Sequence, residues 1–496
     1  MKQLLALHGD LAASRPNDPA ISYQRAPYTG VNLTWGDLWG RAGEIRETLA
    51  MIGLRGGRIS ALVLADHPDF IPALIALWQL DSPPLLLDPR WGSRIKASVL
   101  SHGTPEFVIT VEPSVTATPV NPGSPATAPV DAAFIGYTSG STGDPKAIVF
   151  THERLHAGTL GNVSASLRLR GDQPVRLGLS MRLSGSGMIN VHHVWGAMLG
   201  ACMVVLPELN ISSAREFWMH IERHQIDQAF LVPQLIELVN RFAADRDTSL
   251  RGPLFFTGSA PLSPRTQERF QRRFGLPLFN AYGLSETSSA AFFGHLREDG
   301  LATTSIGVPE RVTARLRDAS GRVVDGSGEG EIELAGDQVF EGYFRNPTAT
   351  AQALADGWLR TGDVARRDDD GRYFLIGRTK DVVTKGGYAI YLSEIEEAAA
   401  AQPDVLEAAA VPLRLADSVE DIGCLVRLVE GRTATAAEIL SSLRRALGVQ
   451  RAPCRVAVTT EPLPRIGLDK LDRPAIIAFW NTLPHAIRSF EARRKL

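Results

Sequence analysis

The sequence predicts an α/β protein with a large N-terminal domain of helix-covered sheets and a small α+β domain at the C-terminus. Patterns typical of helices and strands alternate through the first three-quarters of the chain, which indicates a largely parallel sheet covered by helices. After about residue 325, polar and apolar residues alternate, as in antiparallel strands with one solvated face. A chain of 496 residues is also too long for one hydrophobic core, so we expect two or more domains.

The first elements of the N-terminal part show this alternation. Thr34 and Asp37 form a capping-box pattern, so we expect a helix from Thr34 towards Ile52. The next three segments are predicted to be strand, helix and strand in turn: residues 58–64, 70–80 and 84–87. Residues 111–130 are rich in Pro, Thr and Ser and are expected to form a surface connection.

The C-terminal part is expected to form a separate small domain. Before residue 380 we predict a strand at 328–334 and a tight turn at 368–371, and after it a capped helix at 393–401 and strands at 408–411 and 422–428. We place the boundary near Lys380, which gives an N-terminal domain of residues 1–379 and a C-terminal domain of residues 380–496.

Composition and charge exclude several classes of function. The formal net charge of -2 leaves no basic excess, so no nucleic acid partner is expected. The cysteines Cys202, Cys424 and Cys454 are far apart and odd in number, which predicts neither disulfides nor a zinc site and favours a reducing, cytoplasmic location. The longest apolar stretch, residues 188–206, is interrupted by polar side chains, so we expect no membrane span.

One segment carries the strongest chemical signal: Tyr137-Thr-Ser-Gly-Ser-Thr-Gly-Asp-Pro-Lys146. Its residues are small, turn-forming or hydroxyl-bearing, so its backbone N–H groups and hydroxyls can wrap around phosphate oxygens. It is not a Walker A loop, because Asp-Pro precedes the lysine and Ala147 follows it. A flexible linker is the alternative, but apolar residues flank the segment at 132–135 and 147–150. We therefore expect a buried hairpin that carries a phosphate-binding loop.

Three further segments hold side chains suited to a nucleotide. Residues 280–287 join an aromatic ring that can stack on a base to a carboxylate, Glu286, suited to Mg²⁺. Asp363 lies on a predicted turn where it can accept hydrogen bonds from ribose hydroxyls, and Lys470 lies in another turn-rich segment. Each residue alone would be read as an ordinary surface or turn residue; several motifs together are more specific.

In their order along the chain, these motifs resemble the adenylate-forming superfamily of acyl-CoA synthetases, nonribosomal peptide adenylation domains and luciferases, and most closely its carboxylic acid:CoA ligases. The resemblance runs from about Asp88 to Arg473. It implies an acid–thiol ligase that uses ATP and Mg²⁺: a carboxylate attacks the α-phosphorus of ATP, and the resulting acyl-adenylate passes its acyl group to the pantetheine thiol of CoA. The family fold, a large α/β domain and a small mobile C-terminal domain, agrees with the pattern described above.

The resemblance also implies which residues bind the nucleotide. The residues implied for the phosphates are Thr138, Ser139, Gly140, Ser141, Thr142, Gly143 and Lys146. Those implied around the adenine are Gly258, Ser259, Ala260, Asn280, Ala281, Tyr282 and Gly283. Asp363 would bind the ribose, with Arg378 nearby.

The implied catalytic set consists of Lys146, Ser285, Glu286 and Lys470. Ser285 would contact the α-phosphate, and Glu286 would be the metal ligand. Lys470 would bridge the substrate carboxylate and the α-phosphate, a role that suits a compact ammonium. Asp469 stands where the family usually has glycine, but Lys470, the preceding Pro464-Arg465 and the following Asp472-Arg473 match the family, which favours an active lysine.

A second half-reaction is implied as well. The small domain would swing about a hinge residue, which Lys380 matches, and this motion would replace Lys470 with the segment that contains Gly386 and Gly387. Two glycines there would let a slender pantetheine arm approach the acyl carbon.

The segment expected to contact the acid departs from the family pattern. The expected acid-binding residues are Leu183, Ser184, Gly185, His192, Gly258 and Gly283. No acidic residue lies between Asp172 and Glu208, so the ammonium of an α-amino acid would lack a partner. We expect a fatty, aromatic or other non-α-amino acid. Arg182 either pairs with a polar substrate group or forms a structural salt bridge.

Two alternatives stay open. The acceptor could be the phosphopantetheine of an acyl carrier protein, because it presents the same thiol as CoA. The chain could also be a non-catalytic binding homologue with a decayed site, although Lys146, Glu286, Asp363 and Lys470 are all present, which argues against decay.

Overall fold

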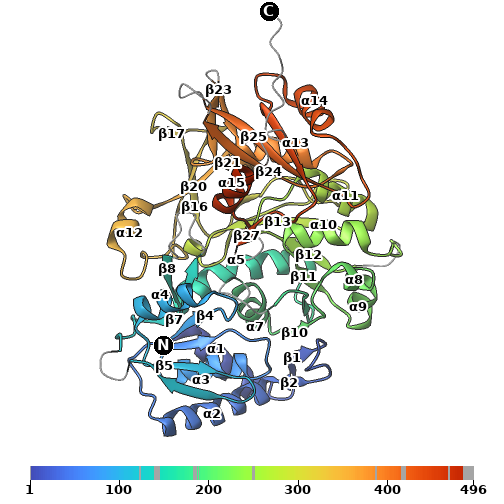
Figure 1. The fold of residues 1–496 in the computed structure, drawn as a ribbon. Helices are drawn as coiled ribbons and strands as arrows, with labels where there is room; N and C mark the ends of the chain where they lie inside the picture. Colours follow the sequence, from blue (N-terminus) through green and yellow to red (C-terminus); the bar gives the residue numbers. More distant parts are fainter. Residues whose placement is uncertain are drawn as a thin grey trace, which may run out of the picture. The chain divides into compact units, whose positions relative to one another are not determined.

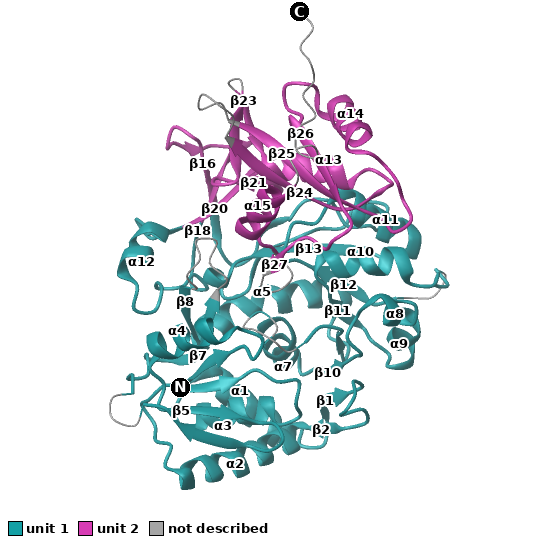
Figure 2. Cartoon of the chain, in the orientation of Figure 1, with its two compact units in different colours: residues 1–314, 334–359 teal, residues 315–333, 360–496 magenta. Residues whose placement is uncertain are grey.

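The computed structural model describes residues 2–121, 125–138, 146–182, 187, 189–248, 252–385, 388–414, 420–466 and 470–483 (Figure 1). The chain forms two compact units, shown in Figure 2. Unit 1 comprises residues 1–314 and 334–359, and unit 2 comprises residues 315–333 and 360–496. Compactness therefore groups residues 360–379 with the C-terminal part, while the boundary near Lys380 stays a prediction.

The larger of the two main sheets of unit 1 has nine strands, and all its inner pairs from β1 to β13 are parallel. In spatial order the strands are β15 (Val308–Pro309), β14 (Ala290–Phe293), β13 (Leu278–Gly283), β12 (Leu254–Thr257), β11 (Gln228–Phe230), β9 (Arg176–Leu179), β10 (Cys202–Val205), β1 (Pro19–Tyr23) and β2 (Asn32–Thr34). Antiparallel strands close both edges. The carboxyl ends of the parallel strands consequently lie along one edge, where α/β proteins bind ligands.

A second sheet of unit 1 has six strands and carries the predicted phosphate hairpin. Its spatial order is β6 (Thr116–Pro119), β5 (Phe107–Thr110), β3 (Ser60–Val63), β4 (Pro84–Leu87), β7 (Ala132–Thr138) and β8 (Lys146–Thr151). Strands β3, β4, β5 and β7 run parallel, while β7 and β8 pair antiparallel. The predicted hairpin is therefore present.

Helices of unit 1 alternate with these strands, as the sequence predicts. The longer ones are α1 (Gln3–Ser14), α2 (Trp35–Ile52), α3 (Phe70–Gln79), α4 (Ser93–Gly103), α5 (His152–Arg170), α10 (Pro233–Phe242) and α11 (Pro264–Phe274). The shorter ones are η1 (Ile189–Val194, a π-helix), α7 (Trp195–Leu199), α8 (Ile211–Ala214), α9 (Phe217–Arg223), η2 (Ser285–Thr287) and α12 (Pro347–Ala353), which the short strand β19 (Leu354–Ala355) follows. Among the described residues, no helix combines the length and apolar character that crossing a bilayer requires.

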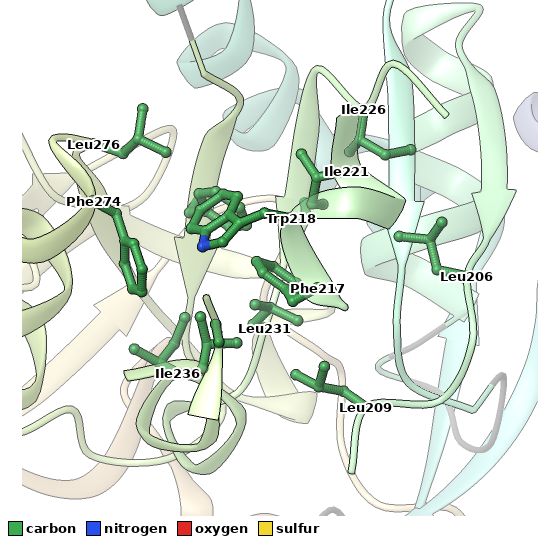
Figure 3. Packing of buried hydrophobic residues seen from close by; sticks show 14 of the residues in the cluster. Leu206, Leu209, Phe217, Trp218, Ile221, Ile226, Leu231, Ile236, Phe274 and Leu276 are labelled. Atoms are coloured by element: carbon green, nitrogen blue, oxygen red, sulfur yellow. The ribbon is translucent and has the colours of Figure 1, made fainter. Parts of the chain in front are cut away.

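Aromatic and aliphatic side chains together form the core beside β11 and β12. Trp218 packs against Phe217 and Phe274, with each pair of ring centroids 4.9 Å apart, and Figure 3 shows the aliphatic residues around them. Aromatic side chains bury large apolar areas, so this cluster fixes the helices that flank the nine-stranded sheet.

Unit 2 is built mainly from antiparallel strands. Its first sheet contains β16 (Thr313–Arg317), β17 (Val323–Val324), β18 (Gly328–Ala335), β20 (Trp358–Arg367) and β21 (Tyr373–Arg378). The remaining elements are β22 (Val382–Lys385), β23 (Tyr388–Tyr391), α13 (Leu392–Ala400), β24 (Val405–Arg414), β25 (Glu420–Leu428), α14 (Ala436–Leu447), β26 (Arg455–Thr459), β27 (Arg465–Ile466), β28 (Lys470–Leu471) and α15 (Arg473–Thr482). Helices α13 and α14 pack on the β24–β25–β26 sheet around a buried aliphatic core.

Most predicted elements are found, with two corrections. Thr34 and Asp37 form the expected capping box at the start of α2. Residues 111–130 are not only a connection, because they include the edge strand β6, which pairs with β5. Helix α13 begins at Leu392 rather than Ser393: the Tyr391 N–H donates to Glu394 Oε1 at 3.3 Å, and the Ser393 hydroxyl donates to the Ile376 carbonyl at 2.6 Å.

Four histidines are buried in unit 1. His8 on α1 and His193 on η1 form a hydrogen bond between their Nε2 atoms at 2.9 Å. His152 packs against the Trp78 ring, and neither of its ring nitrogens has a hydrogen-bond partner among the described residues. Burial lowers the pKa of His8 to about 4 and the pKa values of His152 and His192 to about 3. All four are therefore neutral in the folded protein near neutral pH.

Acid should destabilise unit 1 through these histidines. Between about pH 6.5 and pH 4 the unfolded chain binds protons that the folded chain excludes, so the free energy of unfolding falls as the pH falls. His152→Leu should reduce this pH dependence by up to about 1.4 kcal/mol per pH unit, because one group no longer takes up a proton on unfolding. Urea unfolding at several pH values between 5 and 7.5 measures the slope. Identical slopes for both proteins would contradict the neutral state of His152.

Candidate functional site

The β7–β8 hairpin frames the predicted phosphate loop. Thr138 pairs with Lys146 in the last register position of the hairpin, and Phe134 stacks on Phe150 with centroids 4.7 Å apart. The predicted residues Ser139, Gly140, Ser141, Thr142 and Gly143 lie outside the described residues, as does the side chain of Thr138. The paired strands thus bring both ends of the loop to the edge of the six-stranded sheet.

Glu286 and Lys146 both contact one tyrosine. The Tyr343 hydroxyl donates a hydrogen bond to Glu286 Oε1 at 2.6 Å, and Lys146 Nζ lies 4.7 Å from the centroid of the Tyr343 ring. The structure therefore brings two of the predicted catalytic residues together, although 140 positions separate them in the sequence. Sequence reasoning missed Tyr343 because this contact joins residues 57 positions apart and no local pattern indicates it.

Glu286 fits the magnesium role predicted for it. Mg²⁺ prefers oxygen ligands and is usually held by one or two carboxylates together with nucleotide phosphates and water. The part of the chain that the structure describes holds no cluster of three or more His, Cys, Asp or Glu side chains that could bind a metal without such help. A single carboxylate, oriented by a neutral hydroxyl, is the donor type that a magnesium–nucleotide complex needs.

A buried polar network holds the turn that carries Ser285 and Glu286. Asn190, which is 3 % exposed, accepts a hydrogen bond from the Thr159 hydroxyl at 2.8 Å and donates one to the Ser288 carbonyl. Ser288 has a φ of +58°, in the left-handed region. The network therefore fixes a turn whose backbone conformation is costly for a residue other than glycine.

The predicted adenine-site residues lie on neighbouring strands. Thr257 and Asn280 are register partners in the parallel β12–β13 pair, so Gly258 to Ala260 and Asn280 to Gly283 lie side by side. A Cβ at Gly258 would stand 2.3 Å from the Ala281 carbonyl, and one at Gly283 would stand 2.2 Å from the Ser289 carbonyl. Both positions therefore require glycine for packing alone. Tyr282 is buried, with its ring 5.6 Å from that of Phe292.

The predicted acid-binding segment is described only in part. Leu183, Ser184 and Gly185 lie outside the described residues. His192 is buried in η1 and has a hydrogen bond to the backbone of Leu177. Arg182 donates from Nε to Glu208 Oε2 at 2.8 Å on the surface, which supports the structural salt bridge among the two alternatives.

In unit 2, Asp363 and Arg378 meet across the β20–β21 pair. They are register partners, and Arg378 Nε donates to Asp363 Oδ1 at 2.6 Å. Asp363 is 6 % exposed, whereas the Arg378 side chain is 43 % exposed. Arg378 therefore lies beside Asp363, as expected, and the binding of ribose by Asp363 stays a prediction.

The segment around the predicted hinge is fixed on its C-terminal side. Burial is the largest cause that lowers the pKa of Lys380. Its neighbour Asp381 accepts a hydrogen bond from Arg473 Nε at 3.2 Å, and Arg473 also forms two hydrogen bonds with Glu396, at 2.8 and 3.1 Å. Asp381, Glu396 and Arg473 thus form one ionic network, and its first member directly follows Lys380 in the sequence.

The structure describes only part of the segments that contain Lys470 and the glycine pair. Lys470 begins β28 and pairs with Ile466 of β27, but its side chain is outside the described residues, as are Asp469, Gly386 and Gly387. Lys385, just before the glycines, donates to the Ala452 carbonyl and pairs with Asp421, both at 2.8 Å. These contacts, which sequence reasoning did not find, hold the strand that leads into the predicted pantetheine segment.

Removing the buried amide should loosen the Glu286 turn. Asn190→Leu leaves the Thr159 hydroxyl and the Ser288 carbonyl without their partner, so it should lower the free energy of unfolding by about 2 kcal/mol or more. Thr159→Val loses only one of the two hydrogen bonds and should cost about half as much. Urea unfolding of the two variants measures both. Equal costs would show that the bond to Ser288 contributes nothing.

Comparisons with known proteins extend over nearly the whole chain. The profile of the family described as AMP-binding enzyme matches residues 111–344. Sulfoacetate–CoA ligase of Cupriavidus necator is 29% identical over 510 residues, which cover 95% of this chain and 96% of the relative. Among solved structures, ATP-bound MatB from Rhodopseudomonas palustris superposes with a TM-score of 0.82 at 22% identity, over 97% of this chain and 99% of that chain.

A further solved structure was determined with nucleotide and metal. The o-succinylbenzoate coenzyme A synthetase MenE from Bacillus subtilis, in complex with ATP and a magnesium ion, matches with a TM-score of 0.80 at 22% identity, over 96% of this chain and 99% of that chain. Both structural likenesses confirm the predicted α/β fold class. The family match also spans Lys146, Glu286 and Tyr343.

Proposed function

Because the chain belongs to the family of AMP-binding enzymes, we propose that it activates a carboxylic acid with ATP and passes the acyl group to the thiol of CoA. It is an AMP-forming acid–thiol ligase. The observation that carries the proposal is the convergence of Lys146 and Glu286 on Tyr343, which gathers an ammonium for phosphates and a carboxylate for Mg²⁺ at one point.

The first half-reaction needs charge control rather than a covalent enzyme intermediate. A carboxylate oxygen of the acid attacks the α-phosphorus of ATP, the bond to the β-phosphate oxygen breaks, and pyrophosphate leaves with the electron pair. Lys146 and the loop of residues 138–143 would bind the leaving pyrophosphate, and Ser285 would contact the α-phosphate. When bound, Mg²⁺ neutralises charge on the phosphates. Lys470 would hold the two anionic reactants together against their mutual repulsion.

The remaining residues would position the nucleotide. Asp363, oriented by Arg378, would accept hydrogen bonds from the ribose hydroxyls. The paired segments that contain Gly258 and Asn280 would flank the adenine. In the second half-reaction, the CoA thiol attacks the acyl carbon and AMP leaves. For this step, rotation at Lys380 would exchange Lys470 for the segment at Gly386 and Gly387.

The acid is proposed only as a class. The sequence between Asp172 and Glu208 contains no acidic residue, so a non-α-amino carboxylic acid is favoured. The relative from Cupriavidus necator is named for sulfoacetate, a small organic acid. A carrier protein is the alternative acceptor, since its phosphopantetheine ends in the same thiol.

A screen for pyrophosphate release tests the function and narrows the substrate. Purified protein is given ATP, Mg²⁺ and a panel of short, aromatic and long-chain acids, first with CoA and then with a phosphopantetheinylated carrier protein. An AMP-forming ligase releases pyrophosphate with at least one acid and forms the matching thioester. Release of phosphate and ADP in place of AMP would contradict the proposal.

Lys470→Ala should separate the two half-reactions. The variant should lose acid-dependent ATP–pyrophosphate exchange by about 100-fold or more, because one charge that stabilises the transition state is removed. It should retain most of the thioester formation from a preformed acyl-adenylate. Lys96→Ala is the matched control, because the Lys96 ammonium contacts the Pro89 carbonyl at the surface. Equal losses in both half-reactions would argue against the proposal that the C-terminal domain rotates between one conformation for adenylation and another for thioester formation.

A further inference from the structure

Tyr343 lies between two charged residues of the proposed ATP site. Its hydroxyl donates to Glu286 Oε1 at 2.6 Å, and its ring faces Lys146 Nζ at 4.7 Å from the centroid. The two ends of one side chain thus contact a carboxylate and an ammonium. All three residues lie in unit 1, so this arrangement belongs to a single compact body.

The backbone around Tyr343 is fixed to the same two segments. Tyr343 forms an isolated antiparallel bridge with Ile148 of β8, and Phe344 N donates to the Ala147 carbonyl at 2.8 Å. On the other side, Phe340 N donates to the Glu286 carbonyl at 2.8 Å. The turn at 340–344 therefore joins the strand that begins at Lys146 to the turn that carries Glu286.

A third contact fixes the position of the ring. The Tyr343 N–H donates to the Thr350 hydroxyl at 2.9 Å, and the Phe340 ring meets the Tyr343 ring edge-on at 4.9 Å. Burial and the Glu286 carboxylate both raise the pKa of the Tyr343 hydroxyl above its ordinary value. The hydroxyl and the ring of Tyr343 are therefore both held in place by neighbouring residues.

A neutral tyrosine is suited to hold two opposite charges without cancelling either. The face of its ring attracts a cation, and its hydroxyl donates to an anion. In this arrangement one tyrosine contacts both charged side chains, the Glu286 carboxylate through its hydroxyl and the Lys146 ammonium through its ring.

We propose that Tyr343 is a positioning residue for the magnesium–ATP complex: its hydroxyl orients the Glu286 carboxylate towards Mg²⁺, while its ring holds Lys146 beside the phosphates. This inference rests on the proposed function. Residues that hold a metal ligand by hydrogen bonds typically contribute about 10–100-fold to metal affinity, so the effect of the hydroxyl is large enough to measure.

Two variants separate the roles of the hydroxyl and the ring. Tyr343→Phe removes the hydrogen bond to Glu286 and keeps an aromatic face for Lys146. Tyr343→Leu removes both. Tyr28→Phe is the matched control, because the Tyr28 hydroxyl also donates to a glutamate, Glu112 Oε1 at 3.2 Å, away from the proposed site residues.

Calorimetric titration of ATP at a series of Mg²⁺ concentrations gives the readout, and it needs neither the acid nor turnover. Mg²⁺ increases the affinity for ATP, and the readout is the Mg²⁺ concentration at which half of this increase is reached. Tyr343→Phe should raise that concentration about 10-fold and leave the ATP affinity in EDTA unchanged. Tyr343→Leu should show the same shift and, in addition, weaken ATP binding in EDTA by about 3-fold, because the Lys146 ammonium loses the ring. Tyr28→Phe should match the unsubstituted protein.

The outcomes distinguish this inference from the function on which it rests. If the unsubstituted protein binds magnesium–ATP and Tyr343→Phe shows an unchanged Mg²⁺ dependence, the positioning role is overturned and the proposed function stands. If Tyr343→Phe loses ATP binding equally with and without Mg²⁺, the tyrosine is only structural, and the inference is again overturned. If the unsubstituted protein binds no ATP at any Mg²⁺ concentration, the proposed function itself fails.

Discussion

The hydrogen bond between Tyr343 and Glu286 is the contact on which the proposed site depends. Lys146 begins a strand of the six-stranded sheet, whereas Glu286 follows the last parallel strand of the nine-stranded sheet. The turn at 340–344 forms hydrogen bonds with both segments, so it fixes the end of one sheet relative to the end of the other. Two sheets with separate hydrophobic clusters thereby present Lys146 and Glu286 to the same tyrosine.

Unit 2 uses paired charges in a different way. Asp363 and Arg378 face each other across two antiparallel strands, and Arg473 joins Asp381 to Glu396. Burial raises the pKa of Glu396, and the neighbouring Arg473 guanidinium opposes that shift. Lys380 lies between these two fixed groups. The role of Lys380 as a hinge stays a prediction.

Local patterns in the sequence predicted the helices and strands well, but they did not predict the contacts between these elements. The capping box at Thr34 and the hairpin around the phosphate loop depend on residues close in sequence, and both are found. Helix α13 begins one residue earlier than predicted, and the Ser393 hydroxyl, expected to cap it, donates to the Ile376 carbonyl of β21. The edge strand β6 has a Thr- and Pro-rich sequence that gives no alternating apolar signal.

The same limit applies to the site. Lys146, Glu286 and Asp363 could be identified because they lie in motifs whose residue types suit nucleotide chemistry. Tyr343 and Asn190 could not, since their partners are 57 and 98 positions away and each residue is an ordinary member of its own element. Residues that bind ligands leave a signal in short motifs, whereas residues that hold those side chains in place are visible only in three dimensions.

Oxygen transfer from the acid to the nucleotide tests the central claim most directly. The protein is given ATP, CoA and an accepted acid whose carboxylate oxygens are both labelled with oxygen-18, and the products are analysed by mass spectrometry. If the carboxylate attacks the α-phosphorus, each AMP released carries one labelled oxygen and the pyrophosphate carries none. Label in inorganic phosphate, with ADP as the other product, would show transfer of the γ-phosphoryl group and contradict the account.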